Sequence, residues 1–401
     1  MVKKKILIIG AGYAGIATAV KLQKKITKND NVEIFLVNKH DYHYQTTWLH
    51  ENAVGVRTDE QTMIPIKDLI DQSKVTFIKD TVTALEVKQK KVQLAKSTLD
   101  YDYLVVALGF EVDTSQILGL DDYAYPLGTL EQARTLREQL EMQLAGFNKS
   151  RTNTPLTLVI GGGGFTGVVY LGELVNRLPD LCEKYNVDRA DVKVIAVEKE
   201  PSVMPDFDPE LGEYAMRYLE ERGVEFRLGT AVKKVESDCV TVEKAGRVET
   251  IKSSLLFWSA GVRANRLIEK SDIPDKNGSV EVQDDLRAPG YDDVFVIGDC
   301  AAVYPKNSKA PYRATAQIAM QQAEVCASNL VKIVNNNQNL NVFQFNDPGT
   351  IASLGRKDAI GIISNNKKVF GRTASILKKI IDNRFLYQIG GLSLLLKKRK
   401  L

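Results

Sequence analysis

The clearest pattern in the chain is a short apolar run that ends in closely spaced glycines. Residues 6–9 are apolar after three lysines, and Gly10, Gly12 and Gly15 follow in a GxGxxG arrangement. Apolar residues continue with helical spacing over 16–26, and a second apolar run covers 32–37. A continuous apolar run is typical of a buried parallel strand, so this order predicts a strand, a glycine turn, a helix and a parallel strand.

The same pattern returns once, farther along the chain. A strand is expected over 156–160, followed by Gly162, Gly164 and Gly167, a helix over 168–178 and a strand over 192–197. One glycine turn is a weak signal, whereas two with flanking strands predict two dinucleotide-binding folds. Further strands are expected over 101–109 and 293–298, and a long helix over 315–334.

The acidic residue that ends the second strand of such a fold holds the ribose hydroxyls of the nucleotide. The first fold has Asn38 there, followed by Lys39, and the second has Glu198. A carboxylate repels a 2′-phosphate, so the second fold is expected to prefer NADH to NADPH. Asp299, at the end of another buried strand, has two interpretations: a helix N-cap or an acceptor for the ribityl chain of a flavin.

Length and composition limit the class of protein. The 401 residues predict two to three domains, and 44% hydrophobic and 26% charged residues are ordinary for a globular protein. The uncharged stretch 6–20 is too short to span a membrane, and the strand–turn–helix order contradicts a signal peptide. The four cysteines lie far apart in the sequence, which argues against a disulfide framework, a zinc site and a dithiol centre. The expected compartment is a reducing cytoplasm.

The net charge of +4 is unevenly distributed. Residues 367–401 carry ten Lys or Arg and one Asp, a charge of +9, which leaves −5 for the rest. Leu377, Ile381, Phe385 and Ile389 recur every four residues, and Gly390–Gly391 is expected to break the helix. A tail of this charge is expected to bind an anionic partner, either anionic lipid or nucleic acid. Its amphipathic pattern favours the surface of a membrane. A dimer-forming helix is the alternative.

The whole chain resembles the two-dinucleotide-binding-domain flavoproteins and, within them, the type II NADH:quinone oxidoreductases. The resemblance rests on both glycine turns, Thr47–Glu51, Trp258–Val262, the Ala316-Gln317-x-Ala319-x-Gln321 helix start and the basic tail. It implies an α/β fold with two Rossmann-like domains and a C-terminal amphipathic membrane-anchoring segment. Residues 1–115 and 270–345 are expected to bind FAD, 116–269 to bind NADH, and 346–401 to anchor the chain.

The expected contact residues follow from the glycine turns and from the resemblance. Those for FAD are Gly10, Gly12, Tyr13, Ala14, Gly15, Asn38, Lys39, Val82, Ala107, Gly109, Asp299, Ala316, Gln317 and Lys378. Those for NADH are Gly162, Gly164, Phe165, Thr166, Gly167, Glu198, Ala260 and Gly261. Gln317 is the expected catalytic residue, because the helix start at Thr315–Gln317 is placed beneath the flavin on the quinone side.

The implied activity is oxidation of NADH through FAD and reduction of a quinone, with menaquinone favoured, without proton pumping. The expected location is the cytoplasmic face of the cell membrane, bound through residues 373–401, with a homodimer possible and no nucleic acid. One position departs from the family, which carries Glu where this chain has Val169. That departure leaves a redox sensor or weakly active relative as an alternative, besides a soluble NADH-dependent reductase of an electron carrier.

A metal site is not expected. His40, His43 and His50 fall within eleven residues, but no carboxylate or cysteine spacing beside them matches a ligand set. Glu173, one helical turn after Val169, is not assigned the role of the missing carboxylate.

Overall fold

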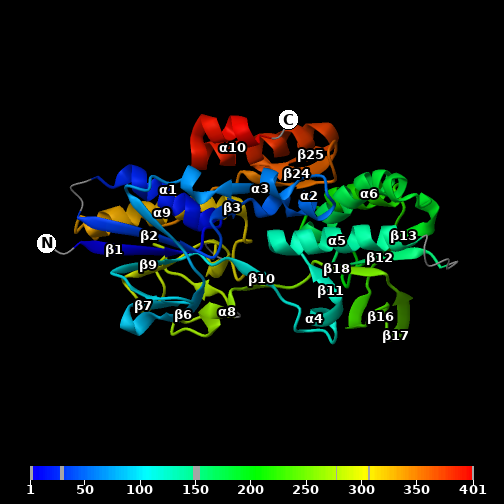
Figure 1. Cartoon of the computed structure of the whole chain (residues 1–401), viewed down its shortest axis with the longest axis horizontal. Helices are drawn as coiled ribbons and strands as arrows, with labels where there is room; N and C mark the ends of the chain where they lie inside the picture. The colour runs from blue at the N-terminus through cyan, green and yellow to red at the C-terminus, as the bar shows by residue number, and fades with distance from the viewer. Residues whose placement is uncertain (1–2, 28–30, 148–153, 277, 306–307, 400–401) are drawn as a thin grey trace.

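The computed structural model describes residues 3–27, 31–147, 154–276, 278–305 and 308–399. Two parallel five-stranded sheets lie side by side along the molecule (Figure 1). The first has the order β21-β9-β1-β2-β5. Its strands are β1 (Lys4–Ile9), β2 (Val32–Asn38), β5 (Val75–Lys79), β9 (Tyr103–Val106) and β21 (Val294–Val296). The chain leaves this sheet after β9 and returns to it only at β21, so the first fold is built from two separate stretches.

The second sheet repeats this design with the order β11-β18-β12-β13-β14. Its strands are β11 (Ala124–Pro126), β12 (Leu156–Gly161), β13 (Val192–Val197), β14 (Val224–Arg227) and β18 (Leu255–Trp258). In both sheets the first strand of the glycine-turn unit, β1 or β12, is central. It pairs in parallel with the strand after the helix on one side and with a later strand on the other. Nucleotides bind outside the carboxyl ends of strands at such a point of reversal.

Helices cover one face of each sheet. The helices α1 (Tyr13–Lys25) and α9 (Ala316–Val334) pack on the first, where Ile6 and Ile8 point into the same core as Ile16 and Leu330. The helices α5 (Leu130–Phe147), α6 (Phe165–Tyr185) and α7 (Pro209–Glu220) belong to the second. Both predicted glycine-turn helices start three residues earlier than expected, because the third glycine already lies inside the helix.

Antiparallel sheets cover the opposite faces. One consists of β6 (Val82–Glu86), β7 (Lys91–Leu94) and β8 (Thr98–Asp100), and it packs on the first sheet. The other consists of β15 (Ala231–Val235), β16 (Cys239–Lys244) and β17 (Arg247–Lys252), and it packs on the second. Two-stranded ribbons pair β3 (Tyr42–Tyr44) with β4 (Met63–Pro65), β10 (Phe110–Val112) with β19 (Val262–Ala264), and β20 (Val280–Glu281) with β22 (Ala301–Ala302).

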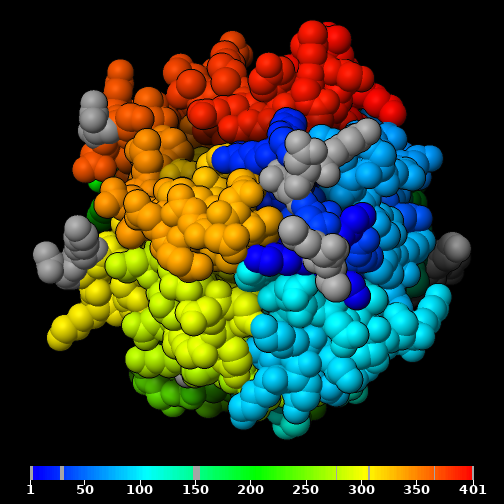
Figure 2. Space-filling view, turned by 90° about the vertical axis from the view of Figure 1, so that its left-hand side faces the viewer, coloured from blue at the N-terminus to red at the C-terminus, as the bar shows by residue number. Residues whose placement is uncertain are grey.

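The last part of the chain folds against both halves. A sheet of β23 (Gly349–Ser353), β24 (Ala359–Ile363) and β25 (Lys367–Phe370) leads into the long helix α10 (Gly371–Lys398). These elements form one edge of the molecule, seen at the top of Figures 1 and 2. The short helices are α2 (Leu49–Ala53), α3 (Asp59–Thr62), α4 (Leu120–Tyr123) and α8 (Arg266–Glu269). No helix in the described ranges is long and apolar enough to cross a membrane.

Candidate functional site: two glycine turns and the start of α9

The first glycine turn has the shape of a phosphate cradle. A Cβ added to Gly10 would lie 2.3 Å from the carbonyl oxygen of Ala107, and one added to Gly15 would lie 1.9 Å from that of Gly10. Gly12 has no atom within 4 Å of such a Cβ, and it caps α1 without a side-chain hydrogen bond. The first and third glycines therefore permit close packing, while the second leaves open space at the positive end of the helix.

The second turn repeats this arrangement. A Cβ at Gly162 would lie 2.8 Å from Ser259 Oγ, and one at Gly167 would lie 1.9 Å from the carbonyl oxygen of Gly162. Gly164, the cap of α6, again faces open space and has no side-chain cap. The residues of both turns thus fit a bound pyrophosphate.

The side chain that ends the second strand differs between the two folds. The amide oxygen of Asn38 accepts a hydrogen bond from Ala11 N–H at 3.1 Å, so this neutral group is held at the first turn. The buried Glu198 carboxylate accepts from Gly163 N–H at 2.5 Å and from Glu200 N–H at 2.9 Å. Both side chains lie where a nucleotide ribose is expected, but only the second fold has a negative charge there.

Asp299 lies where α1, α9 and the end of β21 meet. It belongs to the short turn η5 (Gly298–Cys300), whose N-cap is Ile297, so the N-cap interpretation of Asp299 is wrong. Gly298 N–H donates to the buried Gln322 side chain of α9 at 2.7 Å, and a Cβ at Gly298 would lie 3.1 Å from Ala14. Burial raises the pKa of Asp299 to about 6. A bound hydroxyl group that donated a hydrogen bond to Asp299 would stabilise the charged carboxylate that burial disfavours.

The start of α9 is organised by its polar residues. The Thr315 side chain caps the helix by accepting from Ile318 N–H, which leaves the N–H groups of Ala316 and Gln317 at the helix tip. Gln317 is half-buried. Gln321, one turn on, donates to the backbone carbonyl of Asn346 at 2.9 Å and accepts from its N–H at 3.0 Å. Gln321 therefore fixes the chain before β23.

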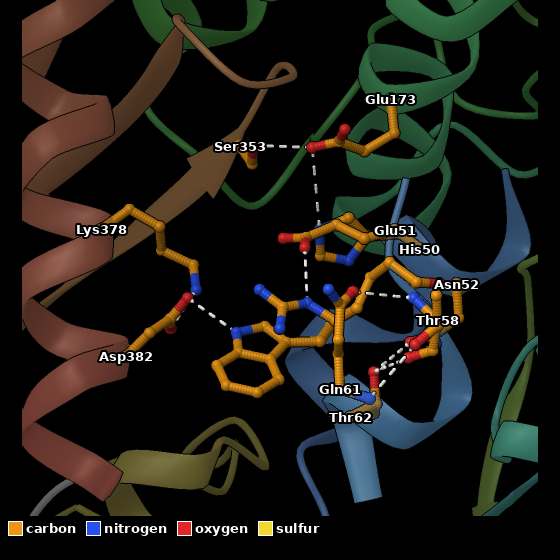
Figure 3. Close-up of polar contacts among 12 residues, drawn as sticks. His50, Glu51, Asn52, Thr58, Gln61, Thr62, Glu173, Ser353, Lys378 and Asp382 are labelled. Atoms are coloured by element: carbon orange, nitrogen blue, oxygen red, sulfur yellow. Dashed lines mark hydrogen bonds and ion pairs between the residues drawn. The ribbon is translucent and has the colours of Figure 1, made fainter. Parts of the chain in front are cut away.

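Lys378 belongs to a polar group that joins α10 to the first fold. Its ammonium pairs with Asp382, and Asp382 accepts from the indole N–H of Trp48 at 3.0 Å. Trp48 is fully buried just before α2. The structure thus holds Lys378 at the contact between α10 and the short turn η1 (Thr46–Trp48), where Figure 3 shows Lys378 and Asp382 side by side.

The apolar stripe of α10 faces inward, which corrects the expectation that it meets a membrane. Phe385 and Ile389 are buried in the core of the first fold, while Leu377 and Ile381 pack on the sheet β23–β25. The side chains that face outward are Ile376, Ile380, Tyr387, Leu392 and Leu396, each 57–61% exposed. The glycine break is confirmed, since Gly391 has φ 67° and ψ −161° at a kink.

The three histidines have three different environments. His40 stacks on Tyr42 with ring centroids 4.8 Å apart. His43 Nδ1 lies 2.9 Å from the carbonyl oxygen of Ala11, and burial lowers its pKa to about 4, so its ring is neutral. His50 lies beside Glu51 and Glu173. The four cysteines are free, and Cys182, Cys300 and Cys326 are buried.

The remaining predicted contacts lie at the ends of strands and at helix starts. Tyr13 begins α1, and its hydroxyl lies 3.0 Å from Thr47 Oγ1. The others are Lys39 after β2, Val82 at the start of β6, Ala107 and Gly109 after β9, Phe165 and Thr166 at the start of α6, and Ala260 and Gly261 after β18. Apart from Val82 and Lys378, the predicted residues lie at the carboxyl ends of parallel strands or at helix starts.

Sequence reasoning missed several residues that support these groups. Gln322 holds the η5 turn, Arg57 and Ser353 bind the carboxylates of Glu51 and Glu173, and Asp382 joins α10 to Trp48. No sequence spacing connects these partners. The only signal was the unusual content of polar side chains at positions of buried helices, as at Gln322 and Asp382.

Two parallel sheets with paired glycine turns define the class of two-domain pyridine-nucleotide oxidoreductases. The family model described as "Pyridine nucleotide-disulphide oxidoreductase" matches residues 4–323. Proteins named type II NADH:quinone oxidoreductase from Staphylococcus saprophyticus and from Staphylococcus aureus are 40% identical over 400 residues, covering 99% of this chain and 99% of theirs. The chain belongs to the type II NADH:quinone oxidoreductase family, as its motifs predicted.

Solved structures agree at the level of the fold. The structure of NDH2 from Plasmodium falciparum in complex with NADH has a TM-score of 0.85 and 18% identity, with 99% of this chain and 97% of that chain covered. A sulfide:quinone oxidoreductase from Aquifex aeolicus has a TM-score of 0.78 and 21% identity, over 96% and 91% of the chains. The predicted α/β fold with two Rossmann-like domains is confirmed.

Proposed function

We propose that this protein oxidises NADH and reduces a quinone, with FAD bound in the first fold and NADH in the second. The observation that carries the proposal is the pair of glycine turns, in which Gly12 and Gly164 both face open space at a helix start. The 40% identity to type II NADH:quinone oxidoreductases over nearly the whole chain supports the same activity. FAD, when bound, supplies the redox chemistry that joins the two substrates.

The residues near each turn have distinct roles in this proposal. Asn38 and Asp299 would hold the ribose and ribityl hydroxyls of FAD, and the tip of α9 at Ala316–Gln317 would face the flavin ring. Glu198 would hold the ribose of NADH and select it over NADPH. The proposed division assigns 1–115 and 270–345 to FAD, 116–269 to NADH and 346–401 to the membrane. It is supported by the sheets, whose strands fall within these first two assignments.

The exposed face of α10 supports binding to the surface of a membrane. Its exposed apolar residues alternate with Lys379, Arg384 and Lys397, a pattern that suits an anionic bilayer. We propose a peripheral enzyme at the cytoplasmic face of the cell membrane, with menaquinone as the quinone and no proton translocation. Quinone would then enter on the side of α10 and Gln317.

Two matched glycine variants test the proposal. A Cβ at Gly12 or Gly164 would meet no atom within 4 Å, so a valine there should be compatible with the fold and would occupy the position expected for a phosphate. Gly12→Val should give a folded protein without FAD. Gly164→Val should keep its FAD, whose absorbance should then resist bleaching by NADH. If Gly12→Val retained FAD, or Gly164→Val were reduced as fast as the wild type, the assignment of the two turns would be wrong.

A flavin- and NADH-binding redox sensor with slow turnover is the second candidate, and Val169 supports it. This side chain is buried in the apolar core one turn before Glu173, at the position where the family carries a carboxylate. Steady-state oxidation of NADH with a soluble menaquinone analogue separates the candidates. Turnover well below one per second that rises in Val169→Glu would favour the sensor, whereas rapid turnover of the wild type would favour the enzyme.

A further inference from the structure

His50, Glu51 and Glu173 form a buried group of three potential metal ligands between the two nucleotide folds. His50 and Glu51 belong to α2, which follows the first glycine-turn unit, and Glu173 belongs to α6 of the second. All three residues are buried, and their side chains are 4–12% exposed. Figure 3 shows them pointing toward one another from the two helices. The proposed activity assigns no role to these three side chains.

The distances within the group are too long for direct hydrogen bonds. His50 Nε2 lies 3.9 Å from Glu51 Oε1 and 4.0 Å from Glu173 Oε1, and all three ligand atoms lie within 4.8 Å of one another. A point equidistant from three atoms with these spacings lies about 2.5 Å from each, close to the distances of about 2.0–2.2 Å at which zinc binds nitrogen and carboxylate oxygen. A small inward movement of each side chain would bring three ligands to zinc distances, and water would take the fourth position of the tetrahedron.

Neighbouring residues hold the two carboxylates in place. Arg57 Nε donates to Glu51 Oε2 at 2.9 Å, which is the oxygen that does not face His50. The Arg57 guanidinium in turn stacks 4.1 Å above the centroid of the buried Trp48 ring. The Ser353 hydroxyl, from β23, donates to Glu173 Oε1 at 3.2 Å. Ligands fixed by such hydrogen bonds are typical of protein metal sites, where the outer partners orient the inner ones.

We propose that His50, Glu51 and Glu173 bind one divalent transition-metal ion, with Zn²⁺ preferred, as a structural link between the two folds. The imidazole favours Zn²⁺ over Ca²⁺ and Mg²⁺, and the two carboxylates supply the negative charge that the cation requires. The ion would connect α2 to α6 across some 120 residues of chain, and binding only to the folded state would stabilise that arrangement. It takes no part in electron transfer.

The test measures metal in the FAD-loaded protein after removal of metals with a chelator and gel filtration. The wild type should bind one equivalent of Zn²⁺ in calorimetry and elemental analysis, and its unfolding midpoint should rise with Zn²⁺. X-ray absorption at the zinc edge should show nitrogen and oxygen ligands without sulfur. Glu173→Gln and His50→Gln should lose the bound equivalent, and Ser353→Ala should weaken binding by roughly 10–100-fold.

Two variants serve as matched controls. Glu183→Gln changes an exposed carboxylate on the same helix α6, and His40→Asn changes a histidine outside the group. Both should bind Zn²⁺ as the wild type does. A wild type without a stoichiometric equivalent, sulfur at the zinc, or Glu173→Gln that binds normally would overturn the proposal. If Glu173→Gln did not fold, the wild-type stoichiometry and zinc spectrum would still decide the question.

Discussion

The two nucleotide folds differ most in the side chain that ends their second strand. Asn38 and Glu198 occupy the same place relative to their glycine turns, and each is bound to a backbone N–H of its turn. A neutral amide does not repel a phosphate group, whereas the negative charge of a buried carboxylate disfavours binding of a nucleotide with a 2′-phosphate. Selection between NADH and NADPH is therefore assigned to Glu198 alone.

Glu198→Gln should narrow the preference for NADH. Removing the charge takes away the repulsion of a 2′-phosphate, and about 1.4 kcal/mol would change the ratio of the two rates tenfold. The measurement is the rate of flavin bleaching by NADH and by NADPH in stopped flow, with Glu183→Gln as a control on an exposed surface. Equal rates with both nucleotides in the wild type would contradict the role of Glu198.

Asp299 gives the FAD-free protein a dependence on pH. Burial raises its pKa from 3.8 to about 6, so between these values the folded protein holds a proton that the unfolded chain has lost. Its contribution to stability is therefore present at low pH and is lost as pH rises through about 6. Asp299→Asn should remove this dependence and weaken FAD binding. Urea unfolding of the FAD-free protein at pH 4–7 measures how the free energy of unfolding changes with pH. If Asp299→Asn showed the same change with pH as the wild type, the role of Asp299 in this dependence would be refuted.

Gln317 at the tip of α9 is expected to act in the quinone half-reaction. Gln317→Leu should slow reoxidation of the flavin by quinone about a hundredfold, the usual cost of one lost donor of about 3 kcal/mol, and spare reduction by NADH. Stopped-flow absorbance measures each half-reaction separately. Gln321→Leu is a useful comparison, since its side chain binds Asn346 and its loss should lower stability instead. If Gln317→Leu slowed reduction of the flavin by NADH instead, the assignment of the quinone side and the NADH side of the flavin would be reversed.

Among the elements, α10 combines two tasks on opposite faces. Its inner face fills the core of the first fold through Phe385, Leu386 and Ile389, and its outer face exposes apolar and basic side chains. Deletion of 373–401 would thus damage the core as well as any membrane contact. A test of membrane binding must change the outer face alone.

Replacing Ile376, Ile380, Leu392 and Leu396 together with serine should reduce binding to anionic vesicles by more than tenfold. Each exposed side chain would otherwise contribute roughly 1 kcal/mol on entering the bilayer interface. Cosedimentation at low and high salt measures the loss, and salt should weaken the wild type by screening its basic residues. Leu118→Ser with Val248→Ser removes equally exposed residues elsewhere and should change nothing. Retained binding in the quadruple variant would favour the dimer interpretation of the helix.

At the level of the whole molecule, the first fold depends on two stretches of chain that are far apart in sequence. The strand β21 completes the first sheet nearly 200 residues after β9, and α9 and α10 close its helical face. The proposed FAD contacts come from both stretches, including Gly12 and Asp299. Bound FAD should therefore hold the two stretches of the first fold together.

Removal of FAD should lower the unfolding midpoint of the whole chain. A ligand at a hundred times its dissociation constant stabilises the folded state by about 2.7 kcal/mol. Differential scanning calorimetry of the yellow protein, with one FAD per chain, against the stripped and the reconstituted protein measures the shift. An unchanged midpoint after stripping would argue against contacts from both stretches.

Much of the fold could be predicted from short motifs in the sequence. The glycine turns could be found because only glycine permits their close backbone contacts, and the apolar runs beside them required buried strands. The family followed from the same motifs and was confirmed. The domain boundaries and individual contact residues stay predictions, because a boundary in a returning chain depends on packing that no short motif contains.

The sequence by itself determined the two parallel sheets, the positions of their turns and the kink at Gly391, since each depends on neighbouring residues. Only the tertiary structure decided which face of α10 is buried, because its inner and outer stripes are both apolar and the choice depends on the complementary core it meets. The tertiary structure alone also brought His50 and Glu51 to Glu173, from helices some 120 residues apart. Side chains that meet across two folds leave no spacing in the sequence, because their proximity comes from the packing of one fold on the other.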